Sequence, residues 1–357
     1  MSQDLLERAR RERSPLIDGN TVTFIWQGDS APRLYADFNG WDEGEGTQLT
    51  LIADGIWTHS IELPADAYVE YAFAEPAIPG QEQERIVDPL NPRRVSNGMG
   101  KYNHFFAMPE AKLDTHTRRR KDVPSGTLTS EVVTGYGFVV GEKRKVHFYQ
   151  PAVKEPCPLL VVWDGQDYLR RAHLTNVIDN LLHEGRIRPV ALAMPEHGRQ
   201  ARFLEYGCAE ITLGFVAEFV LPLARQRLNL IDVADAPGSY GIMGASMGGL
   251  MALYTGLRMP QIFGRVLSQS GAFAFPGYDF VVWDLVRCTK PAGSKFWLDA
   301  GTMESLLDCN RRMAELLAER QYEFRYREYQ GGHNYPSWRS DFVEGLEYLF
   351  PPSNNGA

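Results

Sequence analysis

The sequence has few cysteines, and they are scattered. Its four cysteines, Cys157, Cys208, Cys288 and Cys309, form no C-x-x-C pair. This spacing argues against a zinc knuckle, a redox pair and a disulfide framework. We therefore expect ordinary core or surface thiols, and we expect no protein-bound metal because no metal-ligand spacing is visible.

The sequence also lacks an excess of positive charge and any long apolar run. Lys and Arg number 37 against 45 Asp and Glu, which gives a formal net charge of −8 at pH 7. Such a chain repels a phosphate backbone or an anionic membrane, so we expect no nucleic-acid and no membrane partner. The first residues, MSQDLLERARRERSP, lack the apolar core of a signal peptide, and no run approaches the ~20 apolar residues of a membrane span. These absences predict a cytoplasmic protein.

The chain is long enough for two domains, since 357 residues exceed the usual ~100–200 of one domain. Residues 1–110 contain short alternating runs such as TVTFIWQG and YVEYAFAEP, broken by Gly, Pro, Asp and Asn. This rhythm predicts a small all-β, immunoglobulin-like sandwich. Residues 111–128 have almost no apolar periodicity and four successive basic residues, which predicts a solvated linker.

The pattern changes in residues 129–352. Apolar, strand-like runs such as CPLLVVWDG and KFWLDAG alternate with amphipathic stretches such as ITLGFVAEFVLPLARQRL. Strands that alternate with helices indicate a mostly parallel sheet covered on both faces. We therefore predict an α/β domain with a mostly parallel sheet after the smaller β-sandwich.

The stretch YGIMGASMGGL carries the clearest chemical motif. It places Gly244, Ala245, Ser246, Met247 and Gly248 between an apolar strand and a helix. This G-x-S-x-G pattern is typical of the nucleophile elbow, in which the serine occupies a tight strand-to-helix turn. Ser246 is the predicted nucleophile, and the N–H of Met247 is a predicted oxyanion donor.

A serine nucleophile needs a base, and in α/β-hydrolases the order along the chain is serine, acid, histidine. Seven of the eight histidines precede Ser246, so His333 is the candidate base. The acid stays open between three residues. Glu304 follows the strand KFWLDAG and is favoured, whereas Asp299 lies inside that strand and Asp308 lies about one helical turn farther on.

Other loops at the carboxyl ends of the strands supply further candidates. Gly165 and Gln166 follow the run LLVVWD and are expected to give the second oxyanion N–H. Arg199 and Arg202 follow the next strand and are candidate substrate contacts, although an Arg202–Glu205 ion pair that braces the loop is the alternative. Trp338 is expected either to line the pocket or to pack a helix.

These motifs together resemble the enterochelin (ferric enterobactin) esterase family. The resemblance rests on VVWDGQDY, GASMGG, DAGTMES and GGHNYPSWR, and on TFIWQG, YADFNGW and DPLNPR in the first part. It implies an esterase-D type α/β-hydrolase behind an early-set sandwich. It also implies Ser246, His333 and Glu304 as the triad, with Arg202 beside the substrate.

The implied substrate is a catecholate trilactone siderophore, free or iron-loaded, cleaved through an acyl-enzyme to release iron in the cytoplasm. Any iron would arrive with this small-molecule ester, and no cofactor is expected. Arg93, in the loop 88–97, and the aromatic loop 38–41 are candidate extra walls for so bulky a ligand. The alternative is a feruloyl or acetyl esterase acting on glycan-linked esters, because DFNGW also occurs in glycan-binding modules. The oligomeric state stays open.

Overall fold

The computed structural model describes residues 2–41, 46–76, 84–113, 115–289 and 293–352. The chain forms two compact units, which we name the N-terminal unit and the large unit. The N-terminal unit consists of Met1–Leu113, Gly301–Ser305 and Tyr329–Ser337, and the large unit consists of the remaining residues. Two short segments from late in the chain therefore belong to the same unit as the first 113 residues.

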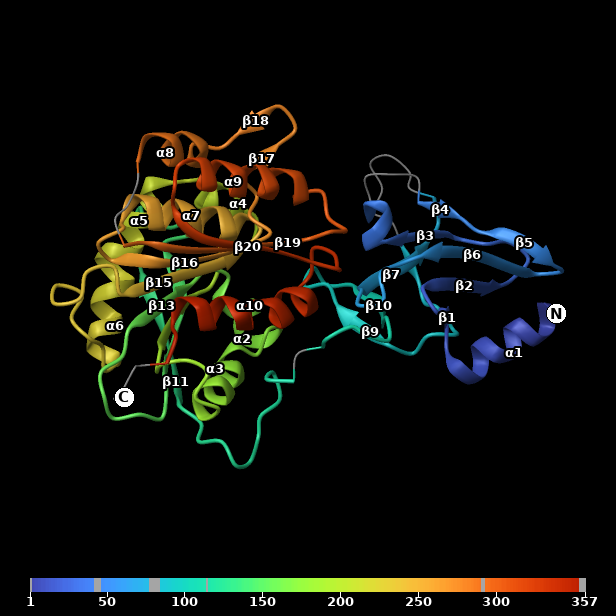
Figure 1. The fold of residues 1–357 in the computed structure, drawn as a ribbon, viewed down its shortest axis with the longest axis horizontal. Helices are drawn as coiled ribbons and strands as arrows, with labels where there is room; N and C mark the ends of the chain where they lie inside the picture. Colours follow the sequence, from blue (N-terminus) through green and yellow to red (C-terminus); the bar gives the residue numbers. More distant parts are fainter. Residues whose placement is uncertain (1, 42–45, 77–83, 114, 290–292, 353–357) are drawn as a thin grey trace. The chain divides into compact units, whose positions relative to one another are not determined.

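The N-terminal unit is built on two antiparallel sheets (Figure 1). Their orders are β1-β2-β6-β5 and β4-β3-β7-β10-β9, and β8 pairs with β7. The strands are β1 (Leu16–Asp18), β2 (Thr21–Gln27), β3 (Arg33–Ala36), β4 (Thr47–Gln48), β5 (Thr50–Ala53), β6 (Ile56–Glu62), β7 (Tyr68–Ala74), β8 (Arg85–Ile86), β9 (Arg94–Ser96) and β10 (Tyr102–Ala107). These two antiparallel sheets agree with the predicted β-rich region, and its immunoglobulin-like sandwich stays a prediction.

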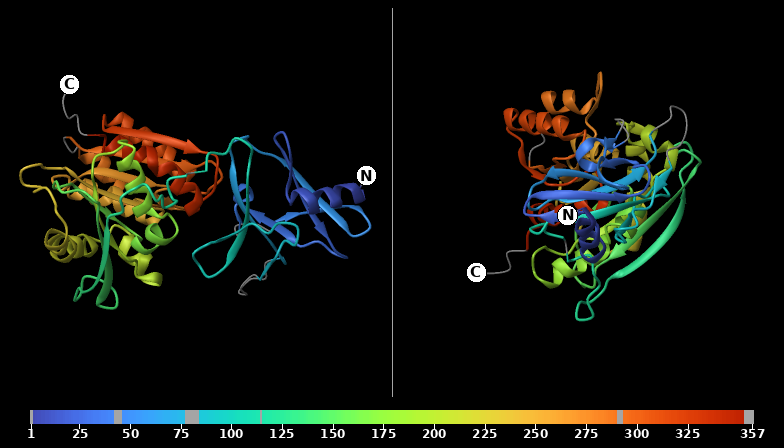
Figure 2. Two further views of the ribbon diagram at one scale, coloured as in Figure 1. Left: turned by 90° about the horizontal axis from the view of Figure 1, so that it is seen from below. Right: turned by 90° about the vertical axis from the view of Figure 1, so that its right-hand side faces the viewer.

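Aromatic side chains from both sheets fill the core of this unit. The ring of Phe24 on β2 lies 5.0 Å from that of Tyr71 on β7 and 5.8 Å from that of Phe106 on β10. All three are fully buried, and alternation along β2 places Val22 on the same buried side. Helix α1 (Ser2–Glu12), which lies near the N label in Figure 2, packs against β1, β2 and β6 through Leu6 and other apolar residues.

The large unit contains an eight-stranded sheet in the order β11-β12-β14-β13-β15-β16-β19-β20. Pairs from β14 to β19 are parallel, and β11 and β12 add antiparallel pairs at one edge. The strands are β11 (Thr127–Thr134), β12 (Lys143–Gln150), β13 (Leu159–Val162), β14 (Ala191–Pro195), β15 (Tyr240–Ala245), β16 (Phe263–Gln269), β19 (Lys295–Gly301) and β20 (Glu323–Tyr329). A small hairpin joins β17 (Ala274–Phe275) to β18 (Tyr278–Asp279).

Helices cover both faces of this sheet. In Figure 1, α7, α8 and α9 lie on one face, whereas α2, α3 and α10 lie on the other. The helices are α2 (Gly165–Arg170), α3 (Leu174–His183), η3 (Arg199–Ala201), α4 (Arg202–Tyr206), α5 (Glu210–Phe215), the π-helical η4 (Val216–Val220), α6 (Leu221–Arg227), α7 (Met247–Arg258), α8 (Val282–Cys288), α9 (Leu307–Glu319) and α10 (Tyr335–Leu349). Every residue of β13 and β15 is buried, as a sheet covered on both sides requires. The mostly parallel α/β prediction is confirmed.

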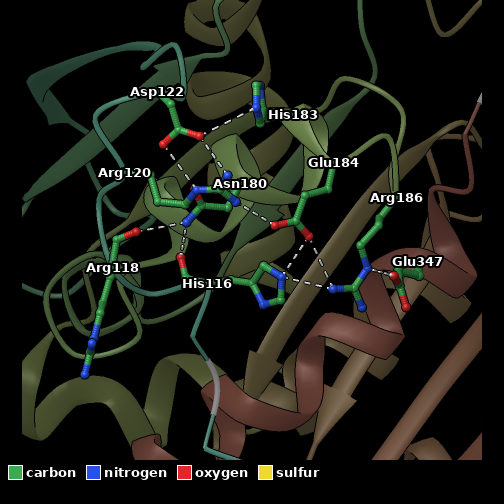
Figure 3. A network of polar contacts seen from close by, with 9 residues as sticks. All are labelled: His116, Arg118, Arg120, Asp122, Asn180, His183, Glu184, Arg186 and Glu347. Atoms are coloured by element: carbon green, nitrogen blue, oxygen red, sulfur yellow. Dashed lines mark hydrogen bonds and ion pairs between the residues drawn. The ribbon is translucent and has the colours of Figure 1, made fainter.

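The segment that was expected to be a solvated linker makes polar contacts with the large unit. In Figure 3 the side-chain amide of Asn180, on α3, donates to the carbonyl oxygens of His116 and Arg118 at 2.6 and 3.0 Å. The guanidinium of Arg120 bonds Glu184 at 2.8 Å. These polar contacts hold the segment on the large unit. They involve no apolar side chains, so the hydrophobic pattern of the sequence could not reveal them. Strand β11 also begins inside the expected linker, and the predicted boundaries 1–110, 111–128 and 129–352 stay a prediction.

Over the described ranges, no single helix is both long and apolar enough for a membrane span. One bent pair, Arg199–Tyr206 with Glu210–Arg227, passes that test by length and composition alone.

Candidate active site

Ser246 occupies a strained turn between β15 and α7. Its backbone has φ 60° and ψ −123°, a combination that costs a non-glycine residue free energy and is found at nucleophile elbows. The turn is fixed by backbone hydrogen bonds, because the N–H of Ser246 donates to Gln269 at 2.8 Å and its carbonyl accepts from Ala272 at 3.1 Å. The side chain is partly exposed, whereas its neighbours are buried. The strain therefore holds the hydroxyl at the surface of the turn.

The glycines around Ser246 are required by close backbone approach. A Cβ at Gly244 would overlap the carbonyl of Gly248, the second residue of α7. A Cβ at Gly249 would come within 2.8 Å of the carbonyl oxygen of Gln269. The strand can therefore pass into the helix at this angle only because these positions carry no side chain.

The residues predicted to bind an oxyanion begin two helices. Met247 begins α7 and Gly165 begins α2, and the first N–H groups of a helix have no acceptor within the helix. A Cβ at Gly165 would overlap the carbonyl of Met194 on β14, which explains the glycine. The side chain of Gln166 is engaged elsewhere, because its Oε1 accepts the N–H of His197 at 3.0 Å. Gln166, like Gly165, can therefore offer only a backbone N–H to an oxyanion.

Arg202 is hydrogen-bonded to the residue just before Ser246 and to a buried carboxylate. Its guanidinium makes two hydrogen bonds with the buried carboxylate of Asp164, at 2.7 and 2.5 Å, and a third with the carbonyl of Ala245 at 3.1 Å. The alternative Arg202–Glu205 ion pair is wrong, because Glu205 instead pairs with Arg144 at 2.6 Å. Asp164 was missed from the sequence, since its partner lies 38 residues away in the chain.

Glu304 and His333 are brought together within the N-terminal unit. The Nδ1 of His333 lies 2.6 Å from Oε2 of Glu304, and the side chain of Glu304 is 1% exposed against 36% for His333. The other carboxylate oxygen accepts the N–H of Gly301 at 3.1 Å. A carboxylate can only accept, so Nδ1 carries the proton and Nε2 keeps its lone pair. This tautomer is the one that a general base requires.

The two alternative acids lie in other surroundings. Asp308 is 92% exposed on the first turn of α9 and lies 3.9 Å from Arg311. Asp299 is completely buried on β19 and accepts hydrogen bonds from Trp297 at 2.9 Å and Gln269 at 3.2 Å. Burial and the neighbouring carboxylate of Asp341 raise the pKa of Asp299. Its side chain is therefore part of a buried network with Trp297 and Gln269.

The remaining predicted substrate contacts differ in their exposure and in their hydrogen bonds to the protein. Trp338 is 5% exposed, and its indole N–H donates to Ser270 at 2.9 Å, which favours the helix-packing alternative. Arg93 bonds Asn91 at 3.0 Å and the carbonyl of Ser14 at 3.0 Å, within its own unit. Arg199 has an exposed side chain on η3. Among the residues that the structure describes, no three His, Cys, Asp or Glu side chains gather in a way that would hold a metal ion.

Asn334 is a further site residue that sequence reasoning missed. Its side-chain oxygen accepts the N–H of Ser337 at 3.0 Å and caps the start of α10. An Asn just before a predicted helix is a known N-cap signal, so Asn334 could have been identified from the sequence. The cap fixes the chain direction immediately after His333.

Comparison with known proteins places this geometry in a family. The esterase model described as "Putative esterase" matches residues 139–349. The iron(III) enterobactin esterase of Dickeya dadantii is 26% identical, with 96% of this chain and 92% of the relative covered. The iron(III) salmochelin esterase of an Escherichia coli strain is 25% identical, with 93% and 88% covered.

Solved structures agree at the level of the fold. The ferric enterobactin esterase of Salmonella typhimurium superimposes with a TM-score of 0.77 at 24% identity, over 92% of this chain and 93% of that one. A ferulic acid esterase has a TM-score of 0.54 at 16% identity and covers only 63% of this chain. The resemblance to the enterochelin esterases is confirmed, and the chain belongs to the esterase family whose model it matches.

Proposed function

We propose that this protein is a serine esterase that hydrolyses the ester bonds of a catecholate trilactone siderophore. Ser246 is the nucleophile, His333 the general base and Glu304 the residue that orients the base. The observation that carries the proposal is the 2.6 Å contact between Nδ1 of His333 and the buried Glu304, in a chain that also holds Ser246 on a strained elbow.

The proposed reaction has two steps, acylation of Ser246 and hydrolysis of the acyl-serine. The hydroxyl of Ser246 attacks the ester carbonyl while Nε2 of His333 takes its proton, and the N–H groups of Met247 and of Gly165 or Gln166 bind the oxyanion. The tetrahedral species collapses, and His333 gives that proton to the departing alkoxide, which leaves an acyl-serine. Water then attacks the acyl group with the same base, and the products are a carboxylic acid and free Ser246.

The substrate class follows from the relatives and not from the triad. The enterobactin and salmochelin esterases align with 96% and 93% of this chain, so the likeness includes the N-terminal unit. A feruloyl esterase activity on glycan-linked esters is the second candidate, favoured by the fold shared with a ferulic acid esterase over 63% of the chain. Arg199 is the proposed substrate contact with a solvent-exposed side chain, and an arginine there suits an anionic catecholate. Hydrolysis in the cytoplasm, with release of iron, completes the proposal.

The test combines one variant with three esters. Ser246→Ala should abolish hydrolysis, because loss of a serine nucleophile costs about 10⁶ in turnover. The fold should persist, since serine and alanine are both small enough for the elbow, and circular dichroism checks it. A variant that keeps a tenth of the activity would rule out the acyl-enzyme. Relative rates of the wild-type protein on a catecholate trilactone, a feruloyl sugar and p-nitrophenyl acetate then rank the two substrate classes.

A further inference from the structure

A buried carboxylate of the N-terminal unit lies against the loop that carries His333. Asp37 follows β3 in the short helix η1 (Asp37–Asn39) and is 4% exposed. It accepts three hydrogen bonds: from the N–H of Glu70 at 2.8 Å, the indole N–H of Trp41 at 2.8 Å and the side-chain amide of Asn334 at 3.2 Å. Asn334 is the residue directly after His333, so Asp37 contacts the base through one intermediate residue.

The backbone before His333 is packed on the same carboxyl group. A Cβ at Gly332 would overlap the side chain of Asp37, so the loop can lie this close only because it has a glycine there. Two residues before Gly332, the carbonyl of Gln330 accepts the N–H of Tyr68 on β7 at 2.9 Å. The segment Gly331–Asn334 is therefore held against β7 and η1 on both sides of Gly332.

We propose that Asp37 is a positioning residue for the catalytic histidine, acting through Asn334 and the backbone of Gly332. This inference rests on the proposed function, because it assigns to Asp37 the orientation of a base whose role is itself proposed. It gives the polar part of the DFNGW motif a task in catalysis, whereas the sequence drew attention to the aromatic residues of that motif.

The role requires the ionised carboxylate. All three partners of Asp37 are donors, so a protonated carboxyl group would turn its O–H toward another donor. Burial raises the pKa of Asp37 to about 7. The hydrogen bonds from the backbone N–H of Glu70 and the indole N–H of Trp41 oppose this rise, the charge of Glu304 adds to it, and the charge of His333 opposes it. The charge on Asp37 also favours the imidazolium that His333 forms when it takes the proton of the nucleophile.

The experiment compares Asp37→Asn with Asp88→Asn in the full-length protein. Asp88 is a matched control because it is also buried in the same unit and accepts hydrogen bonds from Tyr71 at 2.6 Å and Leu90 at 2.8 Å. Neither partner belongs to the loop that carries His333. With p-nitrophenyl acetate, kcat of Asp37→Asn should fall by about 10²-fold, the usual result of a misplaced catalytic group. Its KM should stay unchanged. Asp88→Asn should keep kcat while its melting temperature falls.

Two further readouts separate positioning from a loss of stability. In the wild type, the Nδ1 proton of His333 should give a downfield NMR signal from its short bond to Glu304, and Asp37→Asn should shift or broaden that signal. The rise of kcat with pH should also move in Asp37→Asn but not in Asp88→Asn. Equal kcat, signal and pH profile in the two variants would overturn the inference.

Should Asp37→Asn fail to fold, Asn334→Asp tests the same link. It keeps the oxygen that caps α10 but turns a carboxylate oxygen toward Asp37 in place of the amide donor. Its kcat should also fall, and an unchanged kcat would overturn the inference. Failure of the proposed function is distinguishable, because it appears as an active Ser246→Ala protein. Failure of this inference alone leaves Ser246→Ala inactive and the Asp37 and Asn334 variants fully active.

Discussion

Replacing Glu304 by Gln tests the acid with almost no change of shape. The two carboxylate oxygens accept from Nδ1 of His333 at 2.6 Å and from the N–H of Gly301 at 3.1 Å. An amide offers one oxygen and one NH₂ group, so one of these two donors must face another donor. If the oxygen stays on Gly301, Nδ1 has to accept, and the proton moves to Nε2. The base is then in the wrong tautomer.

The expected magnitude follows from that tautomer. Loss of the equivalent carboxylate costs about 10⁴ in kcat, or roughly 5.5 kcal/mol of transition-state stabilisation. Steady-state hydrolysis of p-nitrophenyl acetate by Glu304→Gln, Asp299→Asn and Asp308→Asn provides the assay. Asp308→Asn should be silent because that side chain is 92% exposed, and Asp299→Asn should keep kcat because its partners belong to the buried network. A mild effect at Glu304 with a crippling one at either aspartate would refute the assignment.

The remaining predictions concern groups around the elbow. Arg202→Lys should lower the free energy of unfolding by roughly 1.5–3 kcal/mol, measured in urea, because lysine cannot make the paired bonds to buried Asp164. An unchanged stability would show that the pair contributes nothing. Asp299→Asn should become more stable relative to wild type as the pH rises from 5 to 8. The pKa of Asp299 is raised in the folded protein, so its contribution to stability is full at low pH and is lost as pH rises through that pKa, by up to about 1.4 kcal/mol per unit. A constant difference between the two proteins across this range would contradict the raised pKa.

The strained elbow at Ser246 was predictable because its geometry is local. Ten contiguous residues contain the strand, the turn and the helix start, and the glycines that permit the turn appear in the same stretch. The histidine followed from chain order alone. The acid could only be ranked, because Asp299 and Glu304 are five residues apart. Whether each side chain points to the buried network or to His333 depends on where β19 ends, which a pattern fixes only to within a few residues.

Contacts between residues that lie far apart in the sequence could not be predicted from a local motif. The pair of Arg202 with Asp164 and the polar contacts of residues 116–120 with α3 join side chains whose spacing repeats nowhere in the chain. The link from Asp37 to Asn334 spans 297 residues. A hydrophobic period identifies the face of an element, whereas a single long-range hydrogen bond depends on the packing of the whole unit.

The division into two units groups the proposed base and acid with the first 113 residues. Sequence boundaries assigned Glu304 and His333 to the hydrolase domain, yet both belong to the unit formed by the first 113 residues. Two residues within 1–110 bond the loop that carries His333: Asp37 bonds Asn334, and Tyr68 bonds Gln330. Deleting residues 1–110 would therefore remove a possible substrate wall and the support of the base at once. Only point variants separate these roles: changes at Asp37 act on kcat for every ester, whereas changes at a substrate wall act on KM for bulky esters alone.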